Sequence, residues 1–378
     1  MLLTVNPSWM LALMQQAKPA PKFTAKTVVL PLIGLLAFFM YICLFNVDLV
    51  SIINTVKQAQ PLPYLAAIAV SFIEILFYSL SWRSILASLK VNLSKIKSYI
   101  YVCAGLFMDI LIPAESVSGE ICRVYLVNRE QKGVSGKVVA SLMTYRLLSM
   151  VMNAVFLILG GVLLFGVMEI NPLVSTVIQL FTAVTVGFMA LFLGICWKEN
   201  WTLKIVNFVV HAGDYLSRGK LHLEKYRQDA LSATKSFHDS MKELIRKPSS
   251  LFAPTVYLAL NWAASMAVCY LVFISLGFDV SWGVVLITTS LVTAIKSIPV
   301  GIPFEVGLPE ITMTTLYVSL GVPADIAATS TILSRLITLW LRFIIGFAAY
   351  QWTETKYAFT KACADEPAIP SGASNQQP

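Results

Sequence analysis

The sequence is poor in charged residues. Asp, Glu, Lys and Arg make up 13% of its 378 residues, whereas hydrophobic residues make up 57%. An average soluble protein carries about 25% charged residues, so this chain has too little polar surface to coat a globule of its size. This shortage excludes a soluble enzyme, a disordered scaffold and a nucleic-acid module. The mean hydropathy of +0.74 is typical of a chain that lies mostly in lipid.

The sequence also lacks motifs for metal or nucleotide chemistry. It contains no Gly-x4-Gly-Lys-Ser/Thr loop, no His-Glu-x-x-His and no Cys-x-x-Cys pair. Its three histidines are scattered through one polar segment. We therefore expect no metal site, no cofactor and no autonomous catalysis. The six cysteines are interpreted as small apolar residues.

Long apolar runs dominate what is present. A membrane-crossing helix needs about 20 apolar residues, and the sequence predicts six full transmembrane helices: Thr27–Phe45, Pro63–Leu89, Val138–Phe165, Leu173–Trp197, Leu251–Leu276 and Ile326–Trp352. Two further apolar segments, Ile96–Ile112 and Trp282–Leu320, end at or contain Pro and Gly. The predicted fold class is therefore an all-α polytopic membrane protein.

The basic residues predict the orientation of these spans. Most of the 28 Lys and Arg residues precede the first span, lie between the second and third, fill the loop 198–250 or follow the last span. Only Lys57 falls on the opposite side. Because cytoplasmic loops are enriched in Lys and Arg, we expect both termini to be cytoplasmic and the protein to lie in the plasma membrane. The net charge of +8 is then mostly a signature of topology.

The polar segments define the predicted domain boundaries. We assign 1–26 to a cytoplasmic N-terminal segment, 27–353 to the transmembrane domain and 354–378 to a disordered cytoplasmic tail rich in Pro, Ser, Ala and Gln. The segment 198–250 carries apolar residues at three- and four-residue steps, among them Phe237, Met241, Leu244 and Ile245. This spacing predicts an amphipathic cytoplasmic helix that packs on the bundle or on the lipid headgroups.

An internal repeat is the most informative pattern in the chain. Ile112-Pro113, Gly119-Glu120, Gly133-Val134 and Arg146-Leu147 recur downstream as Ile298-Pro299, Gly307 with Glu310, Gly321-Val322 and Arg335-Leu336. The separation from Pro to Arg is 33 residues in the first copy and 36 in the second. Repeat one covers about 63–166 and repeat two about 251–353.

The charge distribution makes the two copies run in opposite directions through the membrane. Inverted repeats whose helices are broken by Pro and Gly at matching positions are typical of transporters with a site between the halves. Irregular backbone inside a membrane needs protein or water around it. We therefore expect two re-entrant hairpins, with these helix-break positions: Pro113, Gly119, Pro299, Gly301 and Gly307.

Ionisable residues inside the apolar segments are the candidate site. Each costs about 2.5–3.5 kcal/mol at the centre of a span, so it calls for a partner or a function. The candidate cations for a lipid phosphate are Arg123, Arg146, Lys296, Arg335 and Arg342, with Arg342 seven residues after Arg335 and so on the same helical face. The acids that would orient them or exchange protons are Glu74, Glu120, Glu305 and Glu310.

Two interpretations of these charges stay open. Glu120 with Arg146, and Glu310 with Arg335, would as ion pairs merely hold the broken helices in place. Alternatively, the cations would line a cavity near helix N-termini, where an anion is favoured and where Arg binds phosphate through two hydrogen bonds.

At these residues the chain resembles the lysylphosphatidylglycerol synthase transmembrane-region family, a flippase-like domain. The resemblance rests on Pro113 to Gly119-Glu120-x-x-Arg123, on Tyr145-Arg146, and on the segment from Pro299 to Glu310 with Arg335 downstream. The second motif has fewer glycines than the family pattern. The resemblance implies handling of aminoacylated phospholipids or polyprenyl-linked sugars. The longest polar stretch, about 50 residues, is too short for a fused synthase domain.

The leading hypothesis is a lipid translocase that moves a phosphate-bearing lipid, aminoacylated or polyprenyl-linked, between leaflets. Transport would be driven by ion coupling or by the lipid gradient. One alternative is a membrane subunit or enzyme that presents a lipid phosphate to a separate glycosyl- or aminoacyltransferase. Another is a secondary transporter of a soluble anion. No nucleic-acid partner is expected, and the sequence leaves homo-oligomerisation open.

Overall fold

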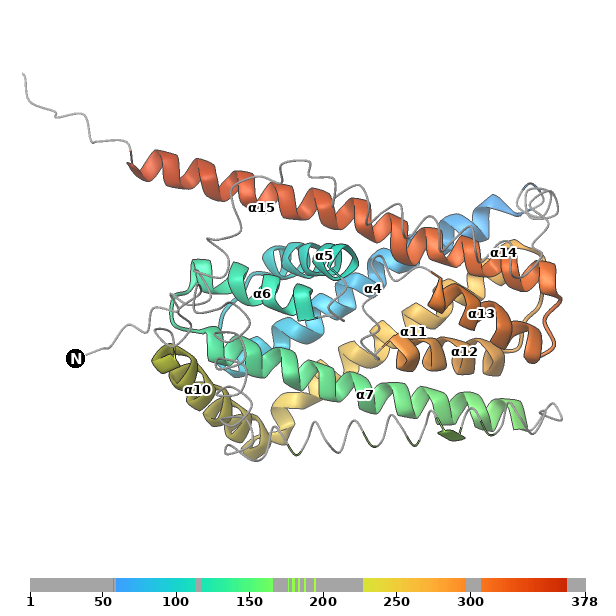
Figure 1. Ribbon diagram of the computed structural model, residues 1–378, viewed down its shortest axis with the longest axis horizontal. Coiled ribbons are helices and arrows are strands. Elements are labelled where there is room, and N and C mark those ends of the chain that lie inside the picture. The colour runs from blue at the N-terminus through green and yellow to red at the C-terminus, as the bar shows by residue number, and fades with distance from the viewer. Residues whose placement is uncertain are drawn as a thin grey trace, which may run out of the picture.

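A computed structural model describes residues 59–112, 117–165, 227–296 and 307–365, together with isolated helical positions between 57 and 194. These residues are helical or lie in short connections, with no strand among them. The all-α fold class is therefore confirmed for the described part of the chain. Figure 1 shows α7 and α15 along opposite long edges, with α4 and α11 crossing between them.

Repeat one contributes four helices: α4 (Pro61–Ser88), α5 (Lys95–Leu111), α6 (Val117–Glu130) and α7 (Ser135–Phe165). The first turn of α4 contains Pro61 and Pro63, whose fixed φ suits a helix start. The N-terminus of α5 is capped by the Ser94 side chain, which accepts a hydrogen bond from the backbone N–H of Lys97 at 3.2 Å.

Repeat two also begins and ends with a long helix, and it has three short helices between them instead of two. It contains α11 (Phe252–Ser275), α12 (Trp282–Lys296), α13 (Leu308–Ser319), α14 (Ala324–Arg335) and α15 (Arg342–Asp365). A stretch of π-helix, Leu336–Leu341, joins α14 to α15. The amphipathic α10 (Arg227–Arg246) and a short 3-10 helix, Pro248–Leu251, precede α11.

Four continuous helical stretches are long and apolar enough to cross a membrane: Pro61–Ser88, Ser135–Leu164, Pro248–Ser275 and Ala324–Tyr357. They coincide with four of the six predicted spans. The other two, Thr27–Phe45 and Leu173–Trp197, lie outside the described residues, apart from isolated helical positions in the second. Large apolar side chains on α7 and α15 are exposed, including Ile158, Val162 and Ile344. A soluble protein would bury such a surface, whereas lipid solvates it.

The first broken segment turns back on itself. The Lys97 Nζ near the start of α5 lies 2.9 Å from Glu130 at the end of α6. At the opposite ends of these two helices, the backbone N–H of Gly119 on α6 donates to the Asp109 carboxylate on α5 at 2.7 Å. The two helices are therefore antiparallel, and the chain reverses between residues 112 and 117.

The three most extensive helix contacts join one repeat to the other. α4 packs along α11, α5 packs on α15, and α12 packs on α7. Glycines allow the last two contacts to be close. A Cβ on Gly160 of α7 would lie 2.8 Å from the Cβ of Leu286, and one on Gly346 of α15 would lie 2.7 Å from the Cβ of Phe107. Both glycines are at the point where the last helix of one repeat meets the broken segment of the other.

The polar segment folds partly as predicted. Phe237, Met241 and Leu244 of α10 are buried in a cluster with Ala140 of α7. Ile245, in contrast, does not pack on the bundle, since this side chain is 57% exposed. It directly follows Leu244 and therefore lies about 100° further around the helix.

The boundary of the predicted C-terminal tail requires a correction. α15 continues as a helix to Asp365, so residues 354–365 are not disordered. Glu354 in this extension pairs with Arg129 of α6 at 2.8 Å, which holds the end of α15 against the first broken segment. The prediction for residues 366–378 lies outside the described residues.

Candidate functional site

Three Glu–Arg pairs connect helices inside the bundle. Glu120 of α6 pairs with Arg146 of α7, Glu310 of α13 pairs with Arg335 of α14, and Glu74 of α4 pairs with Arg342 of α15. The first two pairs occupy matching positions in the two repeats. The ion pairing that the sequence left open is therefore present in both copies.

The pair in repeat two is tight and closed. The Nε of Arg335 lies 2.5 Å from Oε1 of Glu310, and their side chains are only 9% and 4% exposed. The second carboxylate oxygen, Oε2, accepts the backbone N–H of Gly307 at 2.7 Å. Gly307 is the N-cap of α13 and has a φ of 101°, a value that favours glycine. Glu310 thus ties the helix start to Arg335.

The pair in repeat one is looser and more open. The Nε of Arg146 lies 3.4 Å from Oε1 of Glu120, and their side chains are 23% and 12% exposed. A separation of 3.4 Å is long for a charge-assisted hydrogen bond, whose usual range is about 2.7–2.9 Å. Arg146 is therefore easier for a ligand to reach than Arg335.

Arg123 is surrounded by protein groups. Its side chain is buried, its Nε donates to the backbone oxygen of Gly119 at 3.1 Å, and its Nη1 donates to the Tyr78 hydroxyl. The guanidinium also lies 5.4 Å from the Tyr78 ring centroid and 5.7 Å from that of Trp82. These contacts fasten α6 to α4, so in this structure Arg123 positions the neighbouring Glu120 rather than facing a ligand.

Gly119 has a different role from the one predicted. It lies in the first turn of α6 and is therefore not itself a helix break. A Cβ at this position would collide with the Asp109 carboxylate and with the backbone oxygen of Gly105. Gly119 instead permits close approach of α6 to α5. Of the other predicted break positions, Gly307 is the N-cap of α13, whereas Pro113, Pro299 and Gly301 lie outside the described residues, as does Glu305.

Arg335 and Arg342 do not share a helical face. Arg335 contacts Glu310 of α13, whereas Arg342 contacts Glu74 of α4. The π-helix between them has i→i+5 hydrogen bonds and therefore a wider turn than an α-helix. The seven-residue spacing consequently turns the two guanidiniums toward different helices.

The Glu74–Arg342 pair lies where α4, α11 and α15 meet. The Asn261 side chain of α11 donates to the backbone oxygen of Glu74 at 2.9 Å. The Nε of Arg342 is buried and has no hydrogen-bond partner among the described residues. A buried donor that makes no hydrogen bond to the described residues is available to a ligand or a water molecule. Lys296, the remaining predicted cation, is the last residue of α12.

Three residues of the site were not among the predicted binding or orienting residues. The Asp109 carboxylate accepts both the Gly119 N–H and the Ser118 hydroxyl, at 2.7 and 3.1 Å, and so holds the start of α6. Tyr78 and Tyr145 stack with ring centroids 4.5 Å apart. Tyr78 follows Glu74 by one turn and Tyr145 precedes Arg146, so proximity to the buried charges was the available signal.

No group of three or more His, Cys, Asp or Glu side chains in the described ranges is arranged to hold a metal ion. Cys103, Cys122 and Cys269 are buried and free, in line with their interpretation as apolar residues.

Comparison with known proteins places this arrangement in a family. Residues 25–346 match the model of the lysylphosphatidylglycerol synthase TM region. The chain is 24% identical over 293 residues to UPF0104 membrane protein PH1989 of Pyrococcus horikoshii, which covers 75% of this chain and 84% of the relative. It is also 24% identical over 329 residues to a UPF0104 membrane protein of Methanothermobacter thermautotrophicus, covering 86% of this chain and 94% of the relative.

A third relative, UPF0104 membrane protein MJ1595 of Methanocaldococcus jannaschii, is 24% identical over 339 residues and covers 87% of this chain. The family match spans both repeats, including the three Glu–Arg pairs. The chain is an integral membrane protein and belongs to the lysylphosphatidylglycerol synthase TM region family.

Proposed function

We propose that this chain is a lipid translocase that moves a phosphate-bearing lipid between membrane leaflets through a cationic cavity between two inverted repeats. The lipid is an aminoacyl-phospholipid or a polyprenyl-phosphate-linked lipid. The family name supports a lipid-related role, because lysylphosphatidylglycerol is an aminoacyl-phospholipid. The observation that carries the proposal is the unequal closure of two matched Glu–Arg pairs in repeats that pack reciprocally.

The packing between the repeats supports a two-fold relationship between them. α4 and α11, the first helix of each repeat, pack on each other. The two remaining major contacts, α5 with α15 and α12 with α7, are equivalent under exchange of the repeats. A pseudo-two-fold axis between α4 and α11 would produce this set of contacts. The distribution of basic residues in the sequence favours an axis in the membrane plane, as in transporters whose site lies between broken helices. The two re-entrant segments would then enter from opposite sides.

The unequal pairs correspond to two stages of one cycle. In the described conformation both pairs are formed, but the Arg146–Glu120 pair is longer and more exposed than the Arg335–Glu310 pair. If the repeats exchange conformations, the tight pair loosens and the loose pair tightens. A site between them would then become accessible from one side of the membrane at a time. If the two Glu–Arg pairs had the same length and exposure, the structure would show no difference between the two sides of the site.

In this proposed cavity, a lipid phosphate would bind several cations in turn. It would displace Glu120 from Arg146, which is the more accessible guanidinium. The buried Nε of Arg342 offers a further donor, because Glu74 is bound through Nη2. Transfer to Arg335 would then require Glu310 to release it. Arg binds phosphate through paired N–H donors. These hydrogen bonds replace those from water, and without them the transfer of the anion into hydrocarbon has a very high free energy.

A reconstituted assay tests the proposal. Full-length protein is inserted into liposomes that contain lysylphosphatidylglycerol labelled with a fluorophore on an acyl chain, and the fluorophores in the outer leaflet are bleached with dithionite. We expect bleaching to continue past the outer-leaflet fraction only in protein-containing vesicles. Bleaching that stops at the level of protein-free vesicles contradicts translocation.

Two further arms separate the alternatives. Chemical conversion of a lipid-linked donor by the purified chain in detergent, where no second leaflet exists, would favour the enzyme hypothesis. Uptake of a soluble phosphate anion into the vesicles, without lipid movement, would favour the anion transporter.

A further inference from the structure

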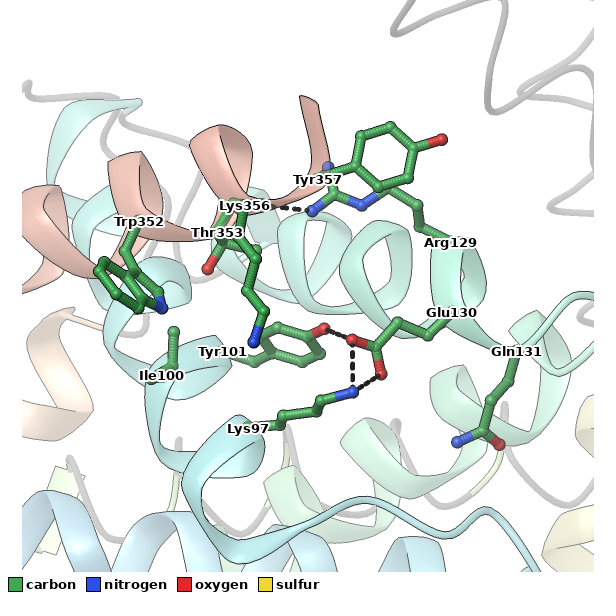
Figure 2. A pocket seen from close by; sticks show the side chains of 10 residues that line it. All are labelled: Lys97, Ile100, Tyr101, Arg129, Glu130, Gln131, Trp352, Thr353, Lys356 and Tyr357. Carbon is green, nitrogen blue, oxygen red and sulfur yellow. Dashed lines mark hydrogen bonds and ion pairs between the residues drawn. The ribbon is translucent and has the colours of Figure 1, made fainter. Parts of the chain in front are cut away.

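A pocket separate from the three ion pairs opens at the basic end of the bundle. It has a volume of about 450 Å³ and lies between the start of α5, the end of α6 and the C-terminal part of α15. Figure 2 shows the ten side chains that line it: Lys97, Ile100, Tyr101, Arg129, Glu130, Gln131, Trp352, Thr353, Lys356 and Tyr357. Sites for small molecules have volumes of about 300–1,000 Å³.

The charge in the pocket is mainly positive. Lys97, Arg129 and Lys356 contribute three cations, whereas Glu130 is the single carboxylate in the lining. Lys97 Nζ lies 2.9 Å from Glu130, and the Tyr101 hydroxyl donates to the same carboxylate at 2.6 Å. In Figure 2, Lys97 and Tyr101 converge on Glu130 from α5. The carboxylate thus occupies a position where several donors meet.

Arg129 is fixed in place on the α15 side of the pocket. Its Nη1 lies 2.8 Å from Glu354, and its guanidinium lies 4.1 Å from the Tyr357 ring centroid. Burial alone would lower the pKa of Arg129, but the Glu354 carboxylate and Tyr125 raise it above its ordinary value overall. The guanidinium therefore remains charged, and its orientation is largely settled before a ligand binds.

The aromatic residues place this pocket at the level of the lipid headgroups. Trp352 is 63% exposed and Tyr357 is 44% exposed, and both lie at the end of the membrane-crossing stretch Ala324–Tyr357. Exposed Trp and Tyr at a helix end are typical of the membrane–water interface. The pocket therefore combines phosphate-binding cations with groups that favour the headgroup region.

We propose that this pocket binds the phosphate of an anionic membrane lipid from the leaflet at the basic end of the bundle. The phosphate lies between Lys97, Lys356 and Arg129, and it competes with Glu130 for Lys97. The exposed Trp352 contacts the glycerol region of the lipid. A soluble phosphate offers the same charge but makes no use of the interfacial aromatics, which is why the occupant is assigned to the membrane.

This site is distinct from the translocation cavity. Glu130 and Glu120 lie on the same helix, ten residues and hence about 15 Å apart along α6. The inference does not rest on the proposed translocase activity, because binding at the pocket requires only that the chain lie in a membrane. A failure of lipid translocation would therefore leave the prediction for this pocket unchanged.

Binding to delipidated full-length protein in detergent tests the inference. Native mass spectrometry measures the apparent Kd for phosphatidylglycerol and, in parallel, for zwitterionic phosphatidylcholine. The pocket variant is Lys97→Gln/Lys356→Gln. The control variant is Lys95→Gln/Lys132→Gln, which removes the same charge from exposed positions near the start of α5 and the end of α6, outside the pocket lining.

We expect the pocket variant to bind phosphatidylglycerol about tenfold or more weakly and the control variant to stay within about twofold of the original protein, because each cation near an anionic lipid strengthens binding severalfold. Unchanged binding in the pocket variant, or equal loss in the control variant, overturns the proposal. Thermal unfolding of both variants verifies that they are folded.

A second variant gives a change of opposite sign. Glu130→Gln removes the carboxylate that competes for Lys97, so phosphatidylglycerol should bind several-fold more tightly. A purely structural role for the Lys97–Glu130 pair predicts no gain. The lipid origin of the ligand is tested by adding inorganic phosphate at the same concentration as the lipid. If inorganic phosphate displaces half of the bound phosphatidylglycerol at this concentration, the assignment to a membrane lipid is overturned. If the lipid stays bound, the assignment is supported.

Discussion

The Nε of Arg335 contacts Oε1 of Glu310 at 2.5 Å in nearly complete burial, whereas Arg146 and Glu120, at the matching positions of the other repeat, are 3.4 Å apart and more exposed. The same two residue types are thus held in two environments. This difference has consequences for stability as well as for the proposed transport.

The two pairs should contribute unequally to stability. Glu310→Gln leaves Arg335 charged and buried without its counter-ion, and breaking a buried pair costs about 3–5 kcal/mol. Glu120→Gln affects a more exposed pair, for which about 1 kcal/mol or less is expected. Denaturant unfolding of the purified protein in detergent measures the difference. Equal losses for the two variants would show that the burial of the pairs does not govern their strength.

Gly119 should not tolerate a methyl group. In Gly119→Ala the new Cβ meets the Asp109 carboxylate and the backbone of Gly105, so α6 must shift from α5. Overpacking of this kind costs about 1–3 kcal/mol. Gly187→Ala is the matched control, because a Cβ there has nothing within 4 Å among the residues that the structure describes. Melting temperatures report both effects, and an unchanged value for Gly119→Ala would mean that the close contact is not required.

The Glu74–Arg342 pair should couple α4 to α15 energetically. Glu74→Gln and Arg342→Gln are combined in a double-mutant cycle, with free energies of unfolding measured for all four proteins. Residues in direct contact give coupling energies of about 0.5–3 kcal/mol. Additive losses would contradict a direct interaction between these two side chains. Arg246→Gln on α10, combined with Glu74→Gln, provides a pair that should be additive.

Much of the fold could be predicted from the sequence because lipid imposes simple rules on the chain. The predicted span Pro63–Leu89 differs from the observed α4, Pro61–Ser88, by only two residues at its start and one at its end. Pro at the first turn and basic residues after the last turn mark these boundaries. The tight packing of Gly160 and Gly346 between repeats is not visible in the same way, since it depends on where distant helices meet.

The site was predicted less completely than the fold. The Glu–Arg pairing follows from the cost of a buried charge, which demands a partner close by. The contacts of Arg123 with Tyr78, and of Asp109 with Gly119, depend on the antiparallel arrangement of α5 and α6. The π-helix after Arg335 was also missed, because its residues, Leu-Ile-Thr-Leu-Trp-Leu, have an ordinary helical composition. The seven-residue spacing to Arg342 was therefore misinterpreted.

The predicted orientation in the membrane can be tested by chemical labelling. Lys95, at the start of α5, should face the cytoplasm, and Lys57 should face the opposite side of the membrane. Single cysteines at these positions, in a cysteine-free background, are treated in intact cells with a membrane-impermeant maleimide. We expect labelling of Lys57→Cys alone, and of Lys95→Cys only after the cells are opened. The reverse pattern would contradict cytoplasmic termini.

Lipid translocation by arginine variants is the most direct test of the central claim. Arg146→Ala and Arg335→Ala are compared with Arg246→Ala, which changes an exposed arginine outside the bundle core, in liposomes that contain labelled lysylphosphatidylglycerol. The account predicts that both site variants slow translocation about tenfold or more, equivalent to about 1.4 kcal/mol in the barrier, while Arg246→Ala retains the original rate. Unchanged translocation in folded Arg146→Ala and Arg335→Ala proteins would contradict the proposed cationic path.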